Sequence, residues 1–199
     1  MGTKEKILAV ALNLFNEEGT QKITTNHIAK AAQISPGNLY YHFKNKEQII
    51  CELYMLMREK IGFEEMDLPE DLCQALLYCR YVASVWWEFR FFRKEMMVLI
   101  EKDGKLKRMV ITDNRTQLEK LGHLIEHLLN EGYLRKSVEE ANLPTLIMMF
   151  SQFWMPYLQL MDQNIDKEHA LEVATEVKRI FLPYLSEKAK LNLKTCKGV

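Results

Sequence analysis

One short segment, PGNLYYH at positions 36–42, concentrates side chains that can hydrogen-bond to a partner or stack on it. Leu39 and Phe43 are four residues apart, so in a helix they share one face and point inward, where Ile28 and Ile34 can pack beneath them. Lysine and glutamate would serve solubility better than the residues left outside, so we predict that this outer face touches a partner. The outward residues are Gly37, Asn38, Tyr40, Tyr41 and His42.

The charge around this segment is locally basic. The whole chain of 199 residues has 27 basic and 27 acidic side chains, so its net charge favours neither a nucleic-acid partner nor a membrane. Between Gly19 and Glu47, however, there are four lysines and no acid, which predicts contact with a polyanion. The lysines are Lys22, Lys30, Lys44 and Lys46.

Three short helices are expected to position these residues, and a fourth follows. An apolar face at helical spacing, which includes Ile7 and Phe15, predicts a first helix that ends at Gly19. Thr24 or Thr25 can cap a second helix that runs through Ala32. Ser35-Pro36 opens the third, and Asn45 caps a fourth from Lys46 to about Lys60. Two short helices joined by a tight turn can place the second of them in a DNA major groove.

The sequence IAKAAQISPGNLYYHFKNKEQI, preceded by ILAVALNLFNEEG and ITT, resembles the DNA-binding domain of the TetR family of bacterial transcriptional regulators. The resemblance implies a helical homodimer that binds a palindromic operator and is released by a small molecule in its C-terminal domain. In the turn, Gln33 replaces the usual glycine, which costs on the order of 1 kcal/mol if φ is positive there. The resemblance also implies phosphate contacts for Thr25, Ser35, Tyr41, His42 and Lys46, and base-edge contacts for Gly37, Asn38 and Tyr40.

The rest of the chain also reads as helical. After a joint at residues 62–71 come long helical patterns at about 70–102, 112–131, 142–163 and 166–188, and residues 188–199 are expected to be frayed. No segment shows sustained alternation of period two, so no sheet is expected. We therefore predict an all-α fold with an N-terminal three-helix helix-turn-helix domain, residues 1–47, and a larger C-terminal ligand-binding and dimerisation domain, residues 48–199.

Aromatic residues surround most of the helix at 72–100, which must be buried on several sides. Its arginines either pair with acids on neighbouring helices, or Arg90 or Arg93 meets an acidic ligand. VWWEFRFFRKEMMVLIEKDGKLKRM resembles a subgroup of TetR-family C-terminal domains, although it is equally typical of an aromatic core helix. We predict that an unidentified small hydrophobic effector, with or without an acidic group, binds here. The candidate contacts are Tyr78, Trp86, Phe89, Arg90, Arg93, His123, Phe150 and Trp154.

The last two predicted helices carry apolar stripes that suit a dimer. The stripe on residues 142–163 is too wide for one intramolecular face, so the two helices are expected to meet their copies in a four-helix interface. Burial within one chain is the alternative. The candidate interface residues are Met149, Phe153, Tyr157, Val177, Phe181 and Tyr184.

Catalysis and metal binding are not expected. His123-Leu-Ile-Glu-His127 has the spacing of a zinc-hydrolase motif, but no third ligand is evident. No catalytic triad or phosphate-binding glycine loop stands out, so we expect no cofactor and no enzyme. The rival class is a helical enzyme, or a small-molecule or lipid-binding protein that does not bind DNA. The acid-free lysine cluster beside Tyr40, Tyr41 and His42 favours a DNA-binding regulator, and specifically a repressor.

The setting is predicted to be cytoplasmic. The four cysteines, Cys51, Cys73, Cys79 and Cys196, lack the two-residue gap of metal and redox motifs, so free thiols in a reducing cytoplasm are expected. The uncharged stretch 141–161 is about as long as the ~20 residues of a membrane span. It contains two prolines and several amides, so a buried or interfacial helix is expected, and no membrane partner.

Overall fold

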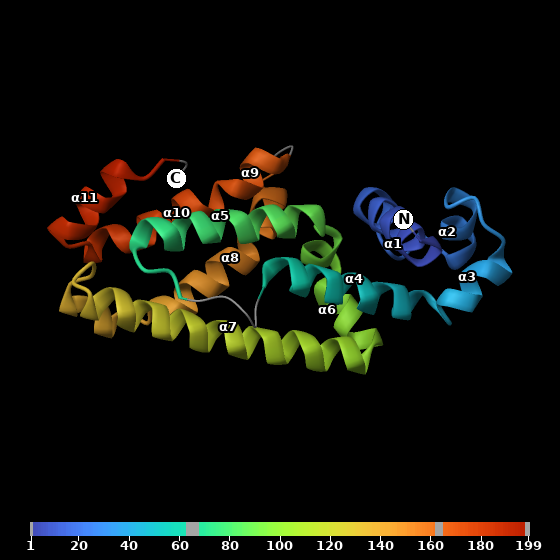
Figure 1. Ribbon diagram of the computed structural model, residues 1–199, viewed down its shortest axis with the longest axis horizontal. Coiled ribbons are helices and arrows are strands. Elements are labelled where there is room, and N and C mark those ends of the chain that lie inside the picture. Colours follow the sequence, from blue (N-terminus) through green and yellow to red (C-terminus); the bar gives the residue numbers. More distant parts are fainter. Residues whose placement is uncertain (1, 63–67, 162–164, 198–199) are drawn as a thin grey trace. The chain divides into compact units, whose positions relative to one another are not determined.

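The computed structural model describes residues 2–62, 68–161 and 165–197 and confirms the all-α prediction. Within these ranges there is no strand, only an isolated bridge between Leu134 and Leu185. The helices, in chain order (Figure 1), are α1 (Thr3–Glu18), α2 (Thr25–Ala31), α3 (Pro36–His42), α4 (Lys46–Ile61), α5 (Leu72–Glu88), α6 (Phe91–Lys102), α7 (Gly104–Asn130), the 3₁₀ turn η1 (Lys136–Glu140), α8 (Leu143–Leu160), α9 (Lys167–Leu171), α10 (Val173–Phe181), the 3₁₀ turn η2 (Leu182–Tyr184) and α11 (Glu187–Thr195).

The chain packs as two compact units. Unit one comprises Met1–Gly62 and Glu88–Ile111, and unit two comprises Phe63–Trp87 and Thr112–Val199. Unit one therefore holds α1–α4, α6 and the first turns of α7. The domain boundary at residue 47 stays a prediction, and most of the joint predicted at 62–71 lies outside the described residues.

The core of unit one is made from the inward faces that the sequence pattern predicts. Ile28, Leu39 and Phe43 are all fully buried, and α1 packs on α2 and on α4. Phe15 of α1 meets Phe91 of α6 with ring centroids 5.3 Å apart, a distance typical of paired aromatic side chains. The α2–α3 pair thus rests on a close-packed base.

The core of unit two joins α5, α7, α8, α10 and α11. Its buried members include Leu76 of α5, Leu128 of α7 and Ile147 of α8. From the C-terminal part of the chain, Phe181 and Ala189 complete it. The C-terminal helices are therefore part of the core rather than an appendage to it.

The predicted helix starts are confirmed by side-chain caps. Thr24 Oγ1 accepts from His27 N, Ser35 Oγ from Asn38 N, and Asn45 Oδ1 from Gln48 N. These caps satisfy amides that a helix leaves free in its first turn. Pro36 occupies the start of α3, and α1 ends at Gly19, whose φ is +83°. Local chemistry therefore fixes the start of each of these helices and the end of α1.

The longer helices differ from their predicted bounds. The helix expected at 70–102 is two helices, α5 and α6, with a break at Phe89–Arg90, and α7 begins at Gly104 instead of residue 112. At the break between α5 and α6, the side chain of Asn16 bonds to the backbone of both helices. At the start of α7, Asp103 Oδ1 accepts from Lys105 N and Leu106 N and so caps that helix. The helix expected at 166–188 is divided into α9, α10 and η2, and residues 162–164 lie outside the described part.

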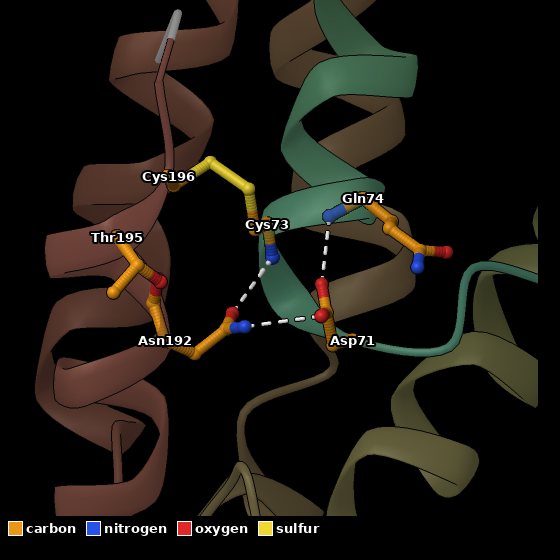
Figure 2. The surroundings of a disulfide bond; sticks show 6 residues. All are labelled: Asp71, Cys73, Gln74, Asn192, Thr195 and Cys196. Carbon is orange, nitrogen blue, oxygen red and sulfur yellow. Dashed lines mark hydrogen bonds between the residues drawn. A yellow bond between two sulfur atoms is a disulfide. The ribbon is translucent and has the colours of Figure 1, made fainter.

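Two expectations about the C-terminal region are wrong. Residues 187–195 form α11 instead of a frayed tail. Cys73 and Cys196, expected as free thiols, are joined in a disulfide with Cα atoms 5.7 Å apart (Figure 2), whereas Cys51 and Cys79 are free. The partners are 123 residues apart in the sequence, so no spacing motif could have paired them.

Candidate nucleic-acid interface

The turn between α2 and α3 sets the direction of α3. Gln33 has a φ of +53°, the left-handed conformation considered for this position from the sequence. Ile34 N then donates to Ala29 O at 3.0 Å, which closes the end of α2. The turn is therefore tight although it contains no glycine.

The outer face of α3 is open to solvent. Tyr41 is 84% exposed and Tyr40 is 50% exposed, whereas Leu39, which directly precedes them, is fully buried. Gly37 and Asn38 are also exposed, and His42 is half-buried. All five residues predicted to point outward thus line the exposed side of one short helix, where a macromolecule can reach them.

Hydrogen bonding and ring contact orient the two tyrosines. The hydroxyls of Thr25 on α2 and Tyr40 on α3 are 3.0 Å apart and share a hydrogen bond. The rings of Tyr41 and His42 meet edge to face with centroids 5.1 Å apart. The Thr25–Tyr40 pair therefore ties the N-terminal turn of α2 to α3, so that both helices present their polar groups together.

Lys46, predicted as a phosphate contact, has a structural role as well. Its Nζ donates to the carbonyl oxygens of Thr20 at 2.6 Å and Ile23 at 3.0 Å, so it holds the α1–α2 loop against the start of α4. An ammonium group has three donors, and these bonds use two of them. Lys22, Lys30 and Lys44 are exposed.

Three residues that join the end of α1 to α6 inside unit one were not predicted from the sequence: Asn16, Thr20 and Glu95. Asn16 is buried, and its amide bonds to backbone atoms of Glu88 and Phe91. Thr20 is also buried: its amide donates to both carboxylate oxygens of Glu95, at 3.0 and 3.3 Å, and its hydroxyl donates to Oε2. A polar residue immediately after an apolar stripe, as Asn16 follows Phe15, was the available signal.

A small cavity of about 50 Å³ lies beside this junction. It is lined by the α1–α2 loop, the start of α4 and the end of α6, and Lys46 and Asp103 are in its wall. Pockets for drug-sized ligands measure roughly 300–1,000 Å³. The cavity has room for water rather than for an effector, and none of the predicted effector residues lines it.

Comparison with known proteins identifies the family. Residues 7–53 match the model described as bacterial regulatory proteins of the tetR family, and residues 58–193 match the model described as a bacterial transcriptional repressor. The chain belongs to the TetR family. Its relatives are transcriptional regulators, which agrees with the expectation that the chain is not an enzyme.

Individual relatives support this assignment over different lengths. QacR of Staphylococcus aureus is 45% identical over 60 residues, 30% of this chain and 32% of its own length, so that match spans about a third of the relative. YttP of Bacillus subtilis, a probable regulator, is 26% identical over 170 residues, 80% of this chain and 79% of its own. A TetR-family structure from Marinobacter aquaeolei VT8 is 28% identical, with a TM-score of 0.85 over 98% of this chain and 97% of its own.

The residues predicted to bind the effector are divided between unit one and unit two. Tyr78, Trp86, His123, Phe150 and Trp154 are in unit two, but Phe89, Arg90 and Arg93 are in unit one. Phe150 and Trp154 pack against the core of unit two, with ring centroids 5.4 Å apart. Trp154 Nε1 donates to His169 O at 2.8 Å, whereas His123 is exposed. Burial lowers the pKa of Arg93 to about 9, so it stays charged at neutral pH.

The residues predicted at the dimer interface all lie in unit two, but some are exposed and others are buried. On α8, Met149, Phe153 and Tyr157 are each more than half exposed. Val177 and Phe181 on α10 are 3% exposed and belong to the chain's own core, and Tyr184 packs against that core. For α10 the alternative of burial within one chain therefore holds, which removes Val177 and Phe181 from the predicted interface.

The described residues offer no metal site: they contain no cluster of three or more histidine, cysteine, aspartate or glutamate side chains that could hold an ion. Among the helices of this part of the chain, none is both long and apolar enough to cross a membrane.

Proposed function

We propose that this TetR-family chain is a cytoplasmic repressor that binds a palindromic DNA operator as a homodimer and is released by a small hydrophobic effector. The phosphate contacts are Thr25, Ser35, Tyr41, His42 and Lys46, and the base-edge contacts are Gly37, Asn38 and Tyr40. The dimer forms through the exposed face of α8, which carries Met149, Phe153 and Tyr157.

The exposed polar face of α3 is the observation that carries this proposal. Its residues stand on a buried base of Leu39 and Phe43, and the turn at Gln33 fixes their direction. Asparagine and tyrosine can hydrogen-bond to base edges, while hydroxyls and lysines suit phosphates. The segment between Gly19 and Glu47, which contains that face, has four lysines and no acid, which favours a polyanion over a neutral ligand.

Footprinting on DNA that flanks the protein's own gene tests the proposal, followed by binding measurements at several salt concentrations. The wild type should protect two half-sites one helical turn, about 34–36 Å, apart. Asn38→Ala should lose roughly 1–3 kcal/mol of discrimination at one operator position. Lys44 is an exposed lysine of the same basic segment, so we also place it near a phosphate; Lys44→Ala should weaken binding to every sequence and lower the salt slope by about one unit.

Asn130→Ala is the matched control for Asn38→Ala, because Asn130 is an exposed asparagine at the end of α7 in unit two. It should bind DNA as the wild type does. No protected region, or equal losses from the Asn38 and Asn130 variants, would contradict the proposal. A protein that binds hydrophobic compounds without binding DNA would belong to the rival class.

The effector is proposed to act by shifting the population of dimer arrangements. A ligand that binds one spacing of the two DNA-reading heads more tightly lowers operator affinity by that difference in affinity and no more. Trp86 and Trp154 are themselves predicted effector contacts and are half-buried, so their fluorescence emission should report on binding. Titration with hydrophobic compounds, including fatty acids and acyl thioesters, should change emission and release DNA over one concentration range.

A further inference from the structure

The end of α11 is fastened to the start of α5 by two kinds of bond in unit two. The disulfide joins Cys73, in the first turn of α5, to Cys196, directly after α11 (Figure 2). Beside it, Asn192 Oδ1 accepts from Cys73 N at 3.0 Å, and Asn192 Nδ2 donates to Asp71 Oδ2 at 3.0 Å. We call this group of four residues the α5–α11 clamp.

The other end of α11 is held independently of the clamp. Ser186 Oγ caps α11 and donates to Gly132 O at 2.7 Å. Lys188 Nζ donates to Glu131 O at 2.6 Å and lies 4.1 Å from the ring centroid of Tyr133. Ala189, the next residue, is fully buried. Opening the disulfide would therefore leave the last turns of α11 held to α5 only by the hydrogen bonds of Asn192, without detaching the beginning of the helix.

The remaining thiols are poorly suited to redox chemistry. Burial raises the pKa of Cys79 to about 12. For Cys51, burial and the hydrogen bond to Asp103 together raise the pKa to about 11. The thiolate is the reactive form of cysteine, so both side chains stay almost entirely protonated at neutral pH. Both therefore react more slowly in thiol exchange than an ordinary cysteine does.

The two sulfur atoms of the clamp are chemically unequal. Cys73 is in the first turn of a 17-residue helix, where the positive end of the helix dipole stabilises a thiolate, although the carboxylate of Asp71 opposes this. Cys196 follows the negative end of α11, which disfavours a thiolate. Both residues are half-buried, so a small thiol has access. Attack at the sulfur of Cys196 is favoured because it releases the more stable thiolate, that of Cys73.

We propose that Cys73 and Cys196 form a reversible thiol–disulfide exchange site for low-molecular-weight thiols, and that its reduction releases the last turns of α11 from α5. The site lies outside the proposed DNA interface. Only its cellular setting, a thiol-containing cytoplasm, rests on the proposed function.

The exchange is balanced in two steps. A thiolate RS⁻ attacks the sulfur of Cys196, a mixed disulfide forms there, and the sulfur–sulfur bond breaks with its electron pair going to Cys73. A second RS⁻ attacks the RS sulfur of the mixed disulfide, which yields RSSR and the thiolate of Cys196. The two protein thiolates take up the two protons that the small thiols lost. The small thiols are thus oxidised by two electrons, and the protein disulfide is reduced.

The test uses the purified full chain without DNA, equilibrated with glutathione and glutathione disulfide at a series of ratios. Alkylation followed by peptide mapping should show Cys73 and Cys196 modified together at reducing ratios and protected together at oxidising ratios, with Cys51 and Cys79 unmodified throughout. Amide exchange in residues 190–197 should become about tenfold faster on reduction, because only the hydrogen bonds of Asn192, and no covalent link, then oppose local opening there. Residues 3–18 should not change.

Three variants separate the clamp from general stability effects. In Cys73→Ser and Cys196→Ser, amide exchange at 190–197 should already be fast and insensitive to the glutathione ratio. Cys79→Ala should respond as the wild type does. A pair that stays open even in glutathione disulfide alone, or stays closed in excess glutathione, overturns the proposal. Unchanged amide exchange after reduction overturns the release of α11. Since no step involves DNA, these results are independent of whether the operator is bound.

Discussion

The side-chain amide of Asn16 donates to the backbone carbonyl of Glu88, 72 residues later, at 2.7 Å. Its oxygen accepts from Phe91 N at 3.1 Å, so one buried side chain from α1 supports the end of α5 and the start of α6. Both are backbone groups that the break between the two helices leaves without a helical partner. The end of α1 is thereby tied to both sides of the break.

Replacing Asn16 with leucine should therefore destabilise the fold. The substitution keeps a similar size but leaves the buried Phe91 amide without an acceptor, so the free energy of unfolding should fall by about 1–3 kcal/mol. Urea denaturation followed by circular dichroism measures this. Asn13→Leu, on the exposed side of the same helix, should stay within about 0.5 kcal/mol of the wild type. Equal effects would show that the Asn16 bridge has no energetic role.

Gly19 and Glu95 are predicted to be energetically coupled. A Cβ at Gly19 would lie 2.7 Å from Glu95 Oε1, and that carboxylate is held by Thr20. With φ +83° and ψ 157°, Gly19 lies in a backbone region that is essentially restricted to glycine, so Gly19→Ala should cost more than the roughly 1–2 kcal/mol of a left-handed alanine, plus the cost of displacing Glu95. In a Glu95→Ala background only the first cost should remain.

Gly132→Ala is the control for this cycle, because Gly132 has a φ of +73° and a Cβ there meets nothing within 4 Å. Its cost should be the same in the wild type and in the Glu95→Ala background, because nothing at Gly132 contacts that carboxylate. If Gly19→Ala costs the same with and without Glu95, the contact with the carboxylate does not constrain this position.

Features that depend on neighbouring residues could be predicted from the sequence, whereas features that depend on contacts between distant residues could not. The caps at Thr24, Ser35 and Asn45 depend on residues within one helical turn, and they were predicted correctly. The break at Phe89 depends on Asn16, and the disulfide joins residues 123 positions apart, so neither leaves a local pattern. Periodicity showed that the faces of α8 and α10 are apolar. It could not show that α10 would be covered by its own chain while α8 stays exposed.

The exposed face of α8 gives a prediction about oligomeric state. Phe153 is 64% exposed, so Phe153→Glu should leave the chain folded but yield monomers in sedimentation experiments, because a charge at the centre of an apolar interface is not tolerated. Leu191→Glu is the matched control: Leu191 is 63% exposed but lies on α11, and this variant should remain dimeric.

Phe181→Glu should behave differently, because Phe181 is buried in the core of one chain. Losing its side chain alone costs about 3–5 kcal/mol, and an unpaired buried charge adds to that, so this variant should unfold or aggregate. A folded monomer from Phe181→Glu, or a folded dimer from Phe153→Glu, would place the interface elsewhere.

Asp103 should make unfolding depend on pH in the acid range. Burial of its carboxylate acts to raise the pKa, but the hydrogen bonds from Leu106 N, the Cys51 thiol and Lys105 N outweigh this and lower the pKa below its ordinary value of 3.8. A lowered pKa means that the stabilisation is complete above pH 3.8 and is lost as the pH falls through the folded-state value.

Asp103→Asn keeps a capping oxygen but does not titrate. Its free energy of unfolding should differ from that of the wild type by a constant amount at neutral pH, and the difference should shrink below about pH 4. Cys51→Ala removes one of the donors, so the acid-dependent part should become smaller. A difference that does not change with pH would rule out this role for the charge of Asp103.

Lys46 and Lys44 provide the sharpest separation of structural and DNA-binding roles, because they are two residues apart and differ in their contacts. Lys46 Nζ holds the carbonyl oxygens of Thr20 and Ile23, whereas Lys44 is exposed. Lys46→Met keeps the aliphatic chain but removes the donors, so the free energy of unfolding should fall by about 1.5–3 kcal/mol. Lys44→Met should stay within about 0.5 kcal/mol of the wild type and lower the salt slope of DNA binding by about one unit.

If Lys46 also touches a phosphate with its third donor, Lys46→Met should lower the slope by a similar amount under conditions where it remains folded. An unchanged slope would assign Lys46 to the α1–α2 loop alone, and an unchanged stability would show that its bonds to the carbonyls are replaced by water at no cost.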